Sequence, residues 1–288
     1  MPSLALFAEV LSLQLRIDDD SEFLRRVVAH ARAGIAAQPE RFRLVTETAA
    51  PNVIVTVGLK AFQRSLNDRG KVPVLALAIA RPLYISSLAA KGLTPEAARD
   101  VCGIFGGQSP RHNLALIRAL MPDAKTLGGF SSDALPVRPA YFVLLREFSF
   151  SFVSEKVASP VEALEKLDSL LRKSDALTIA QTVDAVNSTN IRQLILASLR
   201  AGKPAVGGSN TSFVDEGALG AIFSTPENVW QEGLHRLSLY RTVRTLGASD
   251  YAREWVLAIN RATAATLRLK LPGDDEIKAA IKRLLGEE

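Results

Sequence analysis

Five segments of the sequence place glycines, hydroxyls or charged side chains directly after an apolar run, where a polar ligand can be held. In the first, Gly58 allows a ligand to approach the backbone closely. The helix that starts at Leu59 and Lys60 offers free N–H groups and a positive dipole end to a carboxylate. Lys60 either adds charge to such a site or faces solvent.

Arg81 marks the second segment, because it follows an apolar run directly and Pro82 fixes the turn. An arginine there can clamp an acidic group bidentately, or it is an ordinary surface arginine. The third segment, residues 128–133, contains Phe130, Ser131 and Ser132. Its backbone groups and serine hydroxyls can wrap a small polar ligand, or Ser132 and the following aspartate cap a helix.

The fourth and fifth segments, residues 180–188 and 207–218, are dense in short polar side chains. Gln181 and Thr182 belong to the fourth, and Ser209 and Asn210 to the fifth. This density exceeds what a plain turn needs, which favours ligand contact in both.

Signs of catalysis are weak. The three histidines, His30, His112 and His235, lie in helical stretches without a matched serine or aspartate motif. No G-x-S-x-G elbow, HExxH, P-loop or dinucleotide G-x-G-x-x-G occurs, and residues 106–109 have the wrong spacing for the elbow. We expect a protein that is not an enzyme, with no catalytic residues and no cofactor.

Metal ligation is also disfavoured. The single cysteine, Cys102, excludes an intrachain disulfide and a CxxC zinc site, and a small buried side chain suits it better than a nucleophile. Asp18, Asp19 and Asp20 resemble a solvated lead-in to a helix more than a metal site.

The elements that position these segments alternate along the chain. Apolar runs predict strands at 53–57, 72–77, 125–129, 148–153, 176–179 and 204–208. Amphipathic stretches predict helices at 60–68, 112–120, 160–171, 188–200 and 228–246, the last ending at Gly247. This βαβ pattern occurs twice, so we expect an α/β protein with parallel sheets in two lobes. Ligands of such sheets lie beyond the carboxyl ends of the strands.

The composition fits a globular protein and excludes some partners. The chain has 288 residues, 48% hydrophobic and 23% charged, and its net charge of +5 is scattered, which disfavours nucleic acid. No stretch is long and apolar enough to span a membrane. Residues 1–15 are apolar but lack a basic residue before the apolar part, and Glu9 interrupts them, so they are a poor secretory signal. We expect a cytoplasmic protein, or a periplasmic or other extracytoplasmic one whose export signal was trimmed.

The order of segments resembles the substrate-binding proteins of ABC transporters, of the type that takes up tryptophan and related aromatic amino acids. The resemblance covers about residue 50 to the C-terminus. Its segments are PNVIVTVG at 51–58, GIF at 103–105, LMPDAK at 120–125, SDAL at 174–177, GKPAV at 202–206, EGALGA at 216–221, VLAINRATA at 256–264 and LKLP at 269–272.

The resemblance implies a type I periplasmic-binding-protein fold, with two Rossmann-like lobes, three crossings and a ligand cleft between the lobes. It places the N-terminal lobe at 1–104 plus 224–252 and the C-terminal lobe at 105–223 plus 253–288. It also implies an ABC transporter permease as partner and a monomer. The stretch between Val45 and Asn52 has room only for a short loop where the family has a crossover helix, so we expect an abbreviated first lobe or an open cleft wall.

Three turns depart from the family. Leu59 and Lys60 replace a small hydroxyl residue, Arg81 stands where an aspartate is common, and Ser209 and Asn210 replace an acidic turn. These changes favour a more acidic or a neutral ligand over an amino-acid zwitterion.

Two functions remain open. The first is capture of a small polar ligand, an amino acid or a small carboxylate-like molecule, by hinge closure for import. The second is a sensory or partner-binding module of the same fold without transport.

Overall fold

The structure is a computed structural model that describes residues 9–18, 20–132, 137–179, 186–187 and 189–287. It consists of two compact α/β units. Unit 1 is Met1–Gly106 with Ser224–Trp255, and unit 2 is Gly107–Phe223 with Val256–Glu288. The chain therefore passes between the units three times, and the predicted two-lobed α/β architecture is confirmed.

Unit 1 is built on a six-stranded parallel sheet in the order β11-β5-β4-β3-β1-β2. Its strands are β1 (Leu11–Ile17), β2 (Phe42–Leu44), β3 (Val53–Val57), β4 (Val74–Ile79), β5 (Val101–Phe105) and β11 (Asp250–Tyr251). Its helices are α1 (Glu22–Ala36), α2 (Leu59–Asp68), α3 (Arg81–Ala89) and α9 (Pro226–Val243).

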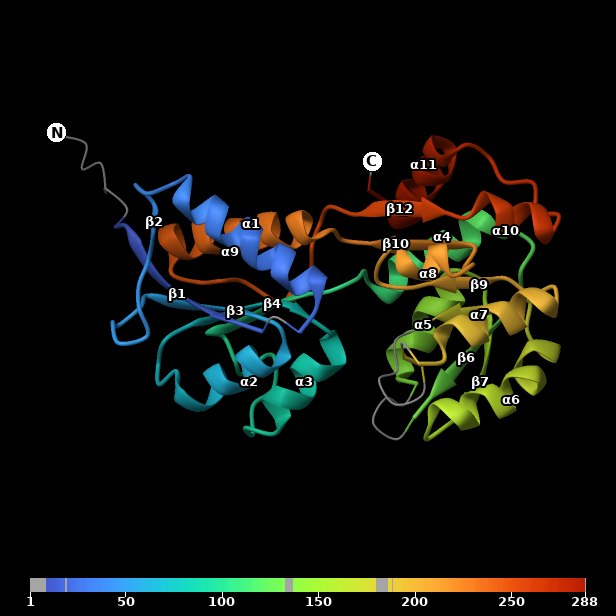
Figure 1. Ribbon diagram of the computed structural model, residues 1–288, viewed down its shortest axis with the longest axis horizontal. Coiled ribbons are helices and arrows are strands. Elements are labelled where there is room, and N and C mark those ends of the chain that lie inside the picture. The colour runs from blue at the N-terminus through green and yellow to red at the C-terminus, as the bar shows by residue number, and fades with distance from the viewer. Residues whose placement is uncertain (1–8, 19, 133–136, 180–185, 188, 288) are drawn as a thin grey trace. The chain divides into compact units, whose positions relative to one another are not determined.

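Strand β3 explains why this sheet is covered on both sides. Val53, Val55 and Val57 pack into a core cluster with residues of α1 and α9, whereas Ile54 packs with residues of α2 and α3. Successive side chains of a strand point to opposite faces, so a strand buried on both faces must be apolar throughout. Figure 1 shows α1 and α9 on one side of the sheet and α2 and α3 on the other.

The short loop expected after Val45 is present, since β3 follows β2 with no helix between them, and strand register makes a crossover helix there unnecessary. Leu13 of β1 pairs with Leu44, the last residue of β2, and with Val53, the first residue of β3. Where β2 ends, β3 begins at the same height on the other side of β1. A short loop therefore suffices, and the sheet still reaches six strands.

Unit 2 repeats the strand order of unit 1 in the sheet β12-β10-β9-β8-β6-β7, with only β12 antiparallel among the pairs described. Its strands are β6 (Thr126–Ser131), β7 (Ser151–Lys156), β8 (Ala176–Ile179), β9 (Ala205–Gly207), β10 (Gly220–Phe223) and β12 (Val256–Ile259). Its helices are α4 (Pro110–Leu120), α5 (Pro139–Glu147), α6 (Pro160–Arg172), α7 (Ile191–Arg200), α8 (Ser212–Asp215), α10 (Arg261–Thr266) and α11 (Asp274–Leu285).

Two predicted boundaries are wrong for identifiable reasons. The strand expected at 148–153 begins only at Ser151, because Phe148 closes α5 and Ser149 has a φ of 56° that interrupts extended backbone. Helix α9 ends at Val243 instead of Gly247, because Arg244 takes the left-handed conformation that closes it. Ser159 caps α6, since its hydroxyl accepts the N–H of Glu162 at 3.2 Å.

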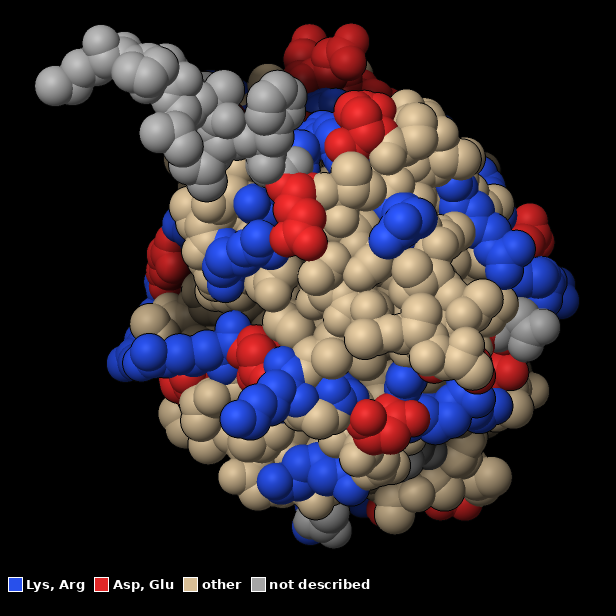
Figure 2. Space-filling view, turned by 90° about the vertical axis from the view of Figure 1, so that its left-hand side faces the viewer, with Lys and Arg blue, Asp and Glu red and all other residues tan. Residues whose placement is uncertain are grey.

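The surface carries no large area of one charge sign on the face shown in Figure 2, where Lys and Arg side chains alternate with Asp, Glu and uncharged residues. This agrees with the scattered net charge of the sequence. Among the helices in the described part of the chain, none is both long and apolar enough to cross a membrane.

Candidate ligand-binding site

The strand order of unit 1 places its topological switch point between β1 and β3. From β1 the chain first adds β2 on one side and then β3, β4 and β5 on the other, so the strand order reverses here. In open α/β sheets, the crevice at such a switch point lies beyond the carboxyl ends of the strands. Asp18 directly follows β1, and Gly58 directly follows β3. The pairing of Ile17 with Val57 brings these two residues side by side.

Asp18 occupies the helix N-terminus that the sequence suggested for a ligand. Its Oδ2 atom accepts the backbone N–H of Lys60 at 2.7 Å. The Lys60 ammonium forms an ion pair with Asp20. Leu59 packs against the apolar cluster beneath α2 and α3. The first turn of α2 therefore already holds a carboxylate, and this carboxylate comes from the chain itself.

Gly58 is required by this arrangement. Its φ of 89° lies in the region that favours glycine, and a methyl group there would come within 2.7 Å of the Asp18 Cβ atom. A glycine at position 58 therefore lets the residues that follow β1 and β3 lie in contact.

Arg81 lies two strands beyond Asp18 on the same edge, as the exposed first residue of α3. Among the described residues it forms no hydrogen bond or ion pair. It follows an irregular stretch of β4 in which Ala78 has a φ of 59°, a rare conformation for a residue with a side chain. The guanidinium is thus available to an acceptor group of a ligand.

Two aromatic rings lie beyond Arg81, at the same edge of the sheet. The rings of Phe105 and Tyr251, the last residues of β5 and β11, lie edge to face with centroids 5.2 Å apart. Burial raises the pKa of the Tyr251 phenol to about 12, although the positive charge of Arg81 opposes this shift. Neither ring was predicted to contact a ligand, and Asp18 was expected to belong to a solvated lead-in to a helix.

The carboxyl edge of unit 2 begins with the end of β6. Phe130 lies in the apolar core beside α6, and Ser131 and Ser132 are buried. The Ser131 carbonyl accepts the N–H of Val157 at 2.9 Å. Gln181 and Thr182, and residue 133 of the third predicted segment, lie outside the described residues.

Ser209 and Asn210 follow β9 on the same edge. Asn210 Oδ1 accepts the N–H of Ser212 at 2.9 Å and so shapes the start of α8. Ser209 lies beside Gly107, since a methyl group on that glycine would sit 3.5 Å from the Ser209 Cβ atom. The structure thus brings the first residues of unit 2 next to the turn after β9.

A hydroxyl, an imidazole and a carboxylate line up at the start of α4. Ser109 Oγ lies 2.7 Å from Nδ1 of His112, and Nε2 of His112 lies 3.2 Å from Glu287. The sequence predicted no matched serine or aspartate motif near any histidine, and the structure shows that Ser109 contacts His112. Ser109 Oγ also accepts the backbone N–H of His112 at 3.3 Å as the helix cap. A capping hydroxyl of this kind stabilises the helix terminus.

Other groupings of reactive side chains are structural. In the described part of the chain, no group of three or more His, Cys, Asp or Glu residues has metal-binding geometry. A shallow depression at the amino ends of β6 and β7 contains Arg118. Its guanidinium donates to the carbonyls of Pro122, Ala124, Phe148 and Ser149, so its donors are already in use.

Solved structures share this architecture across nearly the whole chain. A ligand-free, open substrate-binding protein with adhesive properties from Clostridium difficile is 15% identical, with a TM-score of 0.68 over 92% of this chain and 97% of that one. An ABC domain in complex with L-Trp from Streptococcus pneumonia is 15% identical, with a TM-score of 0.60 over 93% and 98%. A periplasmic ribose ABC transporter protein from Conexibacter woesei is 12% identical, with a TM-score of 0.52 over 94% and 98%.

These likenesses define the class of fold. The chain has the type I periplasmic-binding-protein fold of these transporter proteins, with two α/β lobes built on six-stranded sheets. No protein-family model matches the sequence, and no curated protein is similar to it.

Proposed function

We propose that this chain is the solute-binding component of an ABC-type import system. The observation that carries the proposal is the repeated architecture. Two units with the same strand order, joined by three chain crossings, each present polar groups and glycines at the carboxyl edge of the sheet. Capture of a small polar solute, an amino acid or a sugar, by closure of the two units would use both edges.

The ligand contacts in this proposal come from both edges. Unit 1 contributes the turns at Gly58 and Arg81. Unit 2 contributes Ser131, Ser132, Ser209 and Asn210, together with Gln181 and Thr182. The partner is the permease of the transporter, and the chain acts as a monomer in an extracytoplasmic compartment.

A thermal-shift screen of amino acids, sugars and nucleosides tests the proposal, because a ligand that binds only the native state raises the melting temperature. We expect at least one solute to do so, with binding confirmed by calorimetry. Asn210→Ala should then weaken binding at least tenfold, whereas Arg172→Ala, on the exposed surface of α6, should not. If no solute raises the melting temperature, or if one is turned over to product, the proposal is wrong.

A further inference from the structure

The carboxylate of Asp18 lies where a periplasmic-type site could hold an acidic group of its ligand. Besides the bond of Oδ2 to the N–H of Lys60, the Asp18 backbone N–H donates to the Val57 carbonyl at 2.9 Å. Asp18 can lie this close to the start of α2 because Gly58 has no side chain. Asp18 is therefore anchored by backbone atoms of β3 and α2, and it takes up a favourable position for a negative charge.

The Asp18 carboxylate is half-buried, and the cations described near it bind other groups. The nearby ammonium of Lys60 pairs with Asp20, and the Arg64 guanidinium donates to the carbonyl of Ile17 at 3.2 Å. Asp18 forms no ion pair with a cation in the described part of the chain. Its second oxygen, Oδ1, accepts no hydrogen bond from a described residue.

We propose that Asp18 is a specificity-determining residue that closes this part of the edge to anions and selects a solute with a hydrogen-bond donor, a hydroxyl or an ammonium group. This inference rests on the proposed solute-binding function. It reverses the expectation of a more acidic ligand, because a second carboxylate at the start of α2 would meet the first one. Neighbouring strands lie about 4.8 Å apart, so an acceptor group of the same solute would find Arg81 roughly 10 Å away, two strands further along.

Matched solutes test the selection directly. Ribose with ribonate, and putrescine with succinate, are pairs in which a donor-bearing molecule is compared with an acidic one of similar size. We expect the wild-type protein to bind the donor-bearing member of a pair, or an amino acid through its ammonium group. Asp18→Asn, which keeps an oxygen for the Lys60 N–H, should weaken that binding at least tenfold. Asp168→Asn, which breaks an exposed ion pair on α6, should leave it unchanged.

A second measurement needs no natural solute and uses sulfate as the probe. Removing the carboxylate in Asp18→Ala frees the Lys60 N–H, so sulfate should bind at the start of α2. We expect sulfate, compared with chloride at equal ionic strength, to raise the melting temperature of this variant by at least 2 °C more than that of the wild type. The general stabilising effect of sulfate is removed by the wild-type comparison.

The two measurements separate the possible failures. Preference for ribonate or succinate, or unchanged binding in Asp18→Asn, overturns the inference while leaving solute binding intact. An equal sulfate response in Asp18→Ala and the wild type also overturns it. If no solute binds at all, the proposed function fails, and the sulfate response still decides whether Asp18 closes α2 to anions.

Discussion

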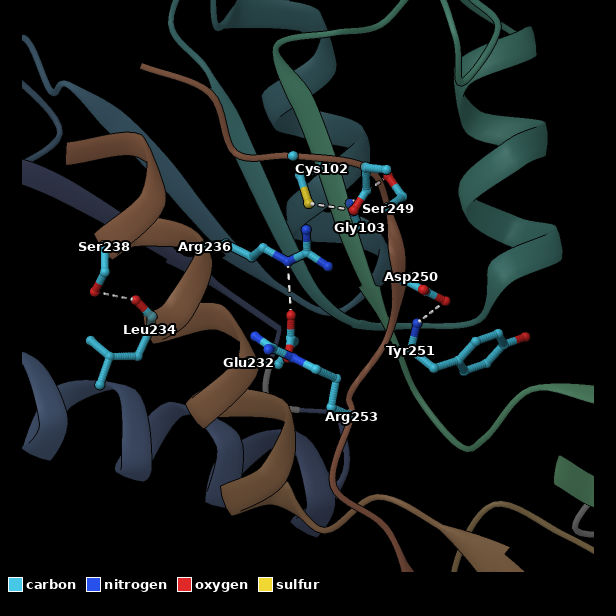
Figure 3. Close-up of polar contacts among 12 residues, drawn as sticks. Cys102, Gly103, Glu232, Leu234, Arg236, Ser238, Ser249, Asp250, Tyr251 and Arg253 are labelled. Atoms are coloured by element: carbon cyan, nitrogen blue, oxygen red, sulfur yellow. Dashed lines mark hydrogen bonds and ion pairs between the residues drawn. The ribbon is translucent and has the colours of Figure 1, made fainter. Parts of the chain in front are cut away.

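Glu232 on α9 accepts a 2.8 Å hydrogen bond from Nε of Arg253, which lies two residues before the end of unit 1 (Figure 3). The Glu232 side chain is only 4% exposed, whereas that of Arg253 is 63% exposed. Arg236, one turn further along α9, donates to the other carboxylate oxygen at 2.8 Å. This bridge fastens the segment that leads out of unit 1, and the Ser224 hydroxyl supports it by donating to the carbonyl of Glu254 at 3.1 Å.

The first prediction is that Glu232→Gln destabilises unit 1 by about 2–4 kcal/mol, because the buried amide leaves Arg236 without its counter-charge. Arg253→Gln should cost only about 0.5–1 kcal/mol, since most of that side chain is in water. Urea unfolding of the two variants measures both values. Equal costs would contradict the view that the buried end of the bridge dominates.

The second prediction concerns pH. Burial alone would raise the pKa of the Glu232 carboxyl, but the hydrogen bonds and charges of Arg253 and Arg236 outweigh it and lower the pKa below its ordinary value. A lowered folded-state pKa adds stability above the unfolded value of about 4.3, and this stability is lost as the pH falls through the folded value. The stability difference between wild type and Glu232→Gln should therefore shrink below pH 4. A difference that stays constant from pH 7 to pH 3 would show that the charge contributes nothing.

The third prediction concerns the contact of β1 with β3. Gly58→Ala should cost about 2–3 kcal/mol, because it adds a strained backbone to a clash with Asp18. Gly202→Ala is the matched control: its φ of 69° is also left-handed, but nothing lies within 4 Å of the added methyl group. It should cost only about 1 kcal/mol. Denaturant unfolding that gave the same loss for both would mean that the approach of Asp18 adds no constraint.

The edge of unit 1 shows what the sequence reveals about the site and what it does not. The apolar run of β3 and the glycine after it are visible as a pattern, so the sequence predicts the strand, the turn at Gly58 and the helix that follows. The alternation of Leu11, Leu13, Leu15 and Ile17 also signals a strand, and it would have placed Asp18 at a strand end. The aspartates after this strand were instead interpreted as a solvated lead-in to a helix.

Other features depend on register and packing, which no local pattern carries. The short loop between β2 and β3 looked like a deletion, because only the pairing of both strands with Leu13 shows that the chain need not cross back. The approach of His112 to Glu287 joins residues 175 positions apart in the sequence. Such contacts follow from tertiary structure, and the short-range periodicity of the chain gives no sign of them.

The fourth prediction concerns a hydroxyl in the middle of the sheet of unit 1. Thr56 on β3 is fully buried, and its Oγ1 atom has no hydrogen-bond partner among the described residues. Thr56→Val replaces the hydroxyl with a methyl group of similar size and should stabilise the protein by about 1 kcal/mol. Thr178→Val is the control, because its hydroxyl donates to the Gly128 carbonyl at 3.1 Å, and the same change there should cost about 1 kcal/mol. A loss of stability in Thr56→Val would reveal a partner for that hydroxyl.

The last prediction is that Cys102 does not react in the folded protein. Its side chain is fully buried in β5, and burial raises the pKa of the thiol to about 12, against the opposing charge of Arg236. At pH 8 the thiolate fraction is then on the order of 1 in 10,000, and the thiolate is the reactive form. A thiol reagent should label the native protein only as fast as it unfolds, and should label it at once in denaturant. Because Glu232→Gln loosens the helix that carries Arg236, Cys102 in that variant should be labelled faster than in the wild type. Rapid stoichiometric labelling of the native wild type would show that β5 is open to solvent, and that Cys102 is not part of the core.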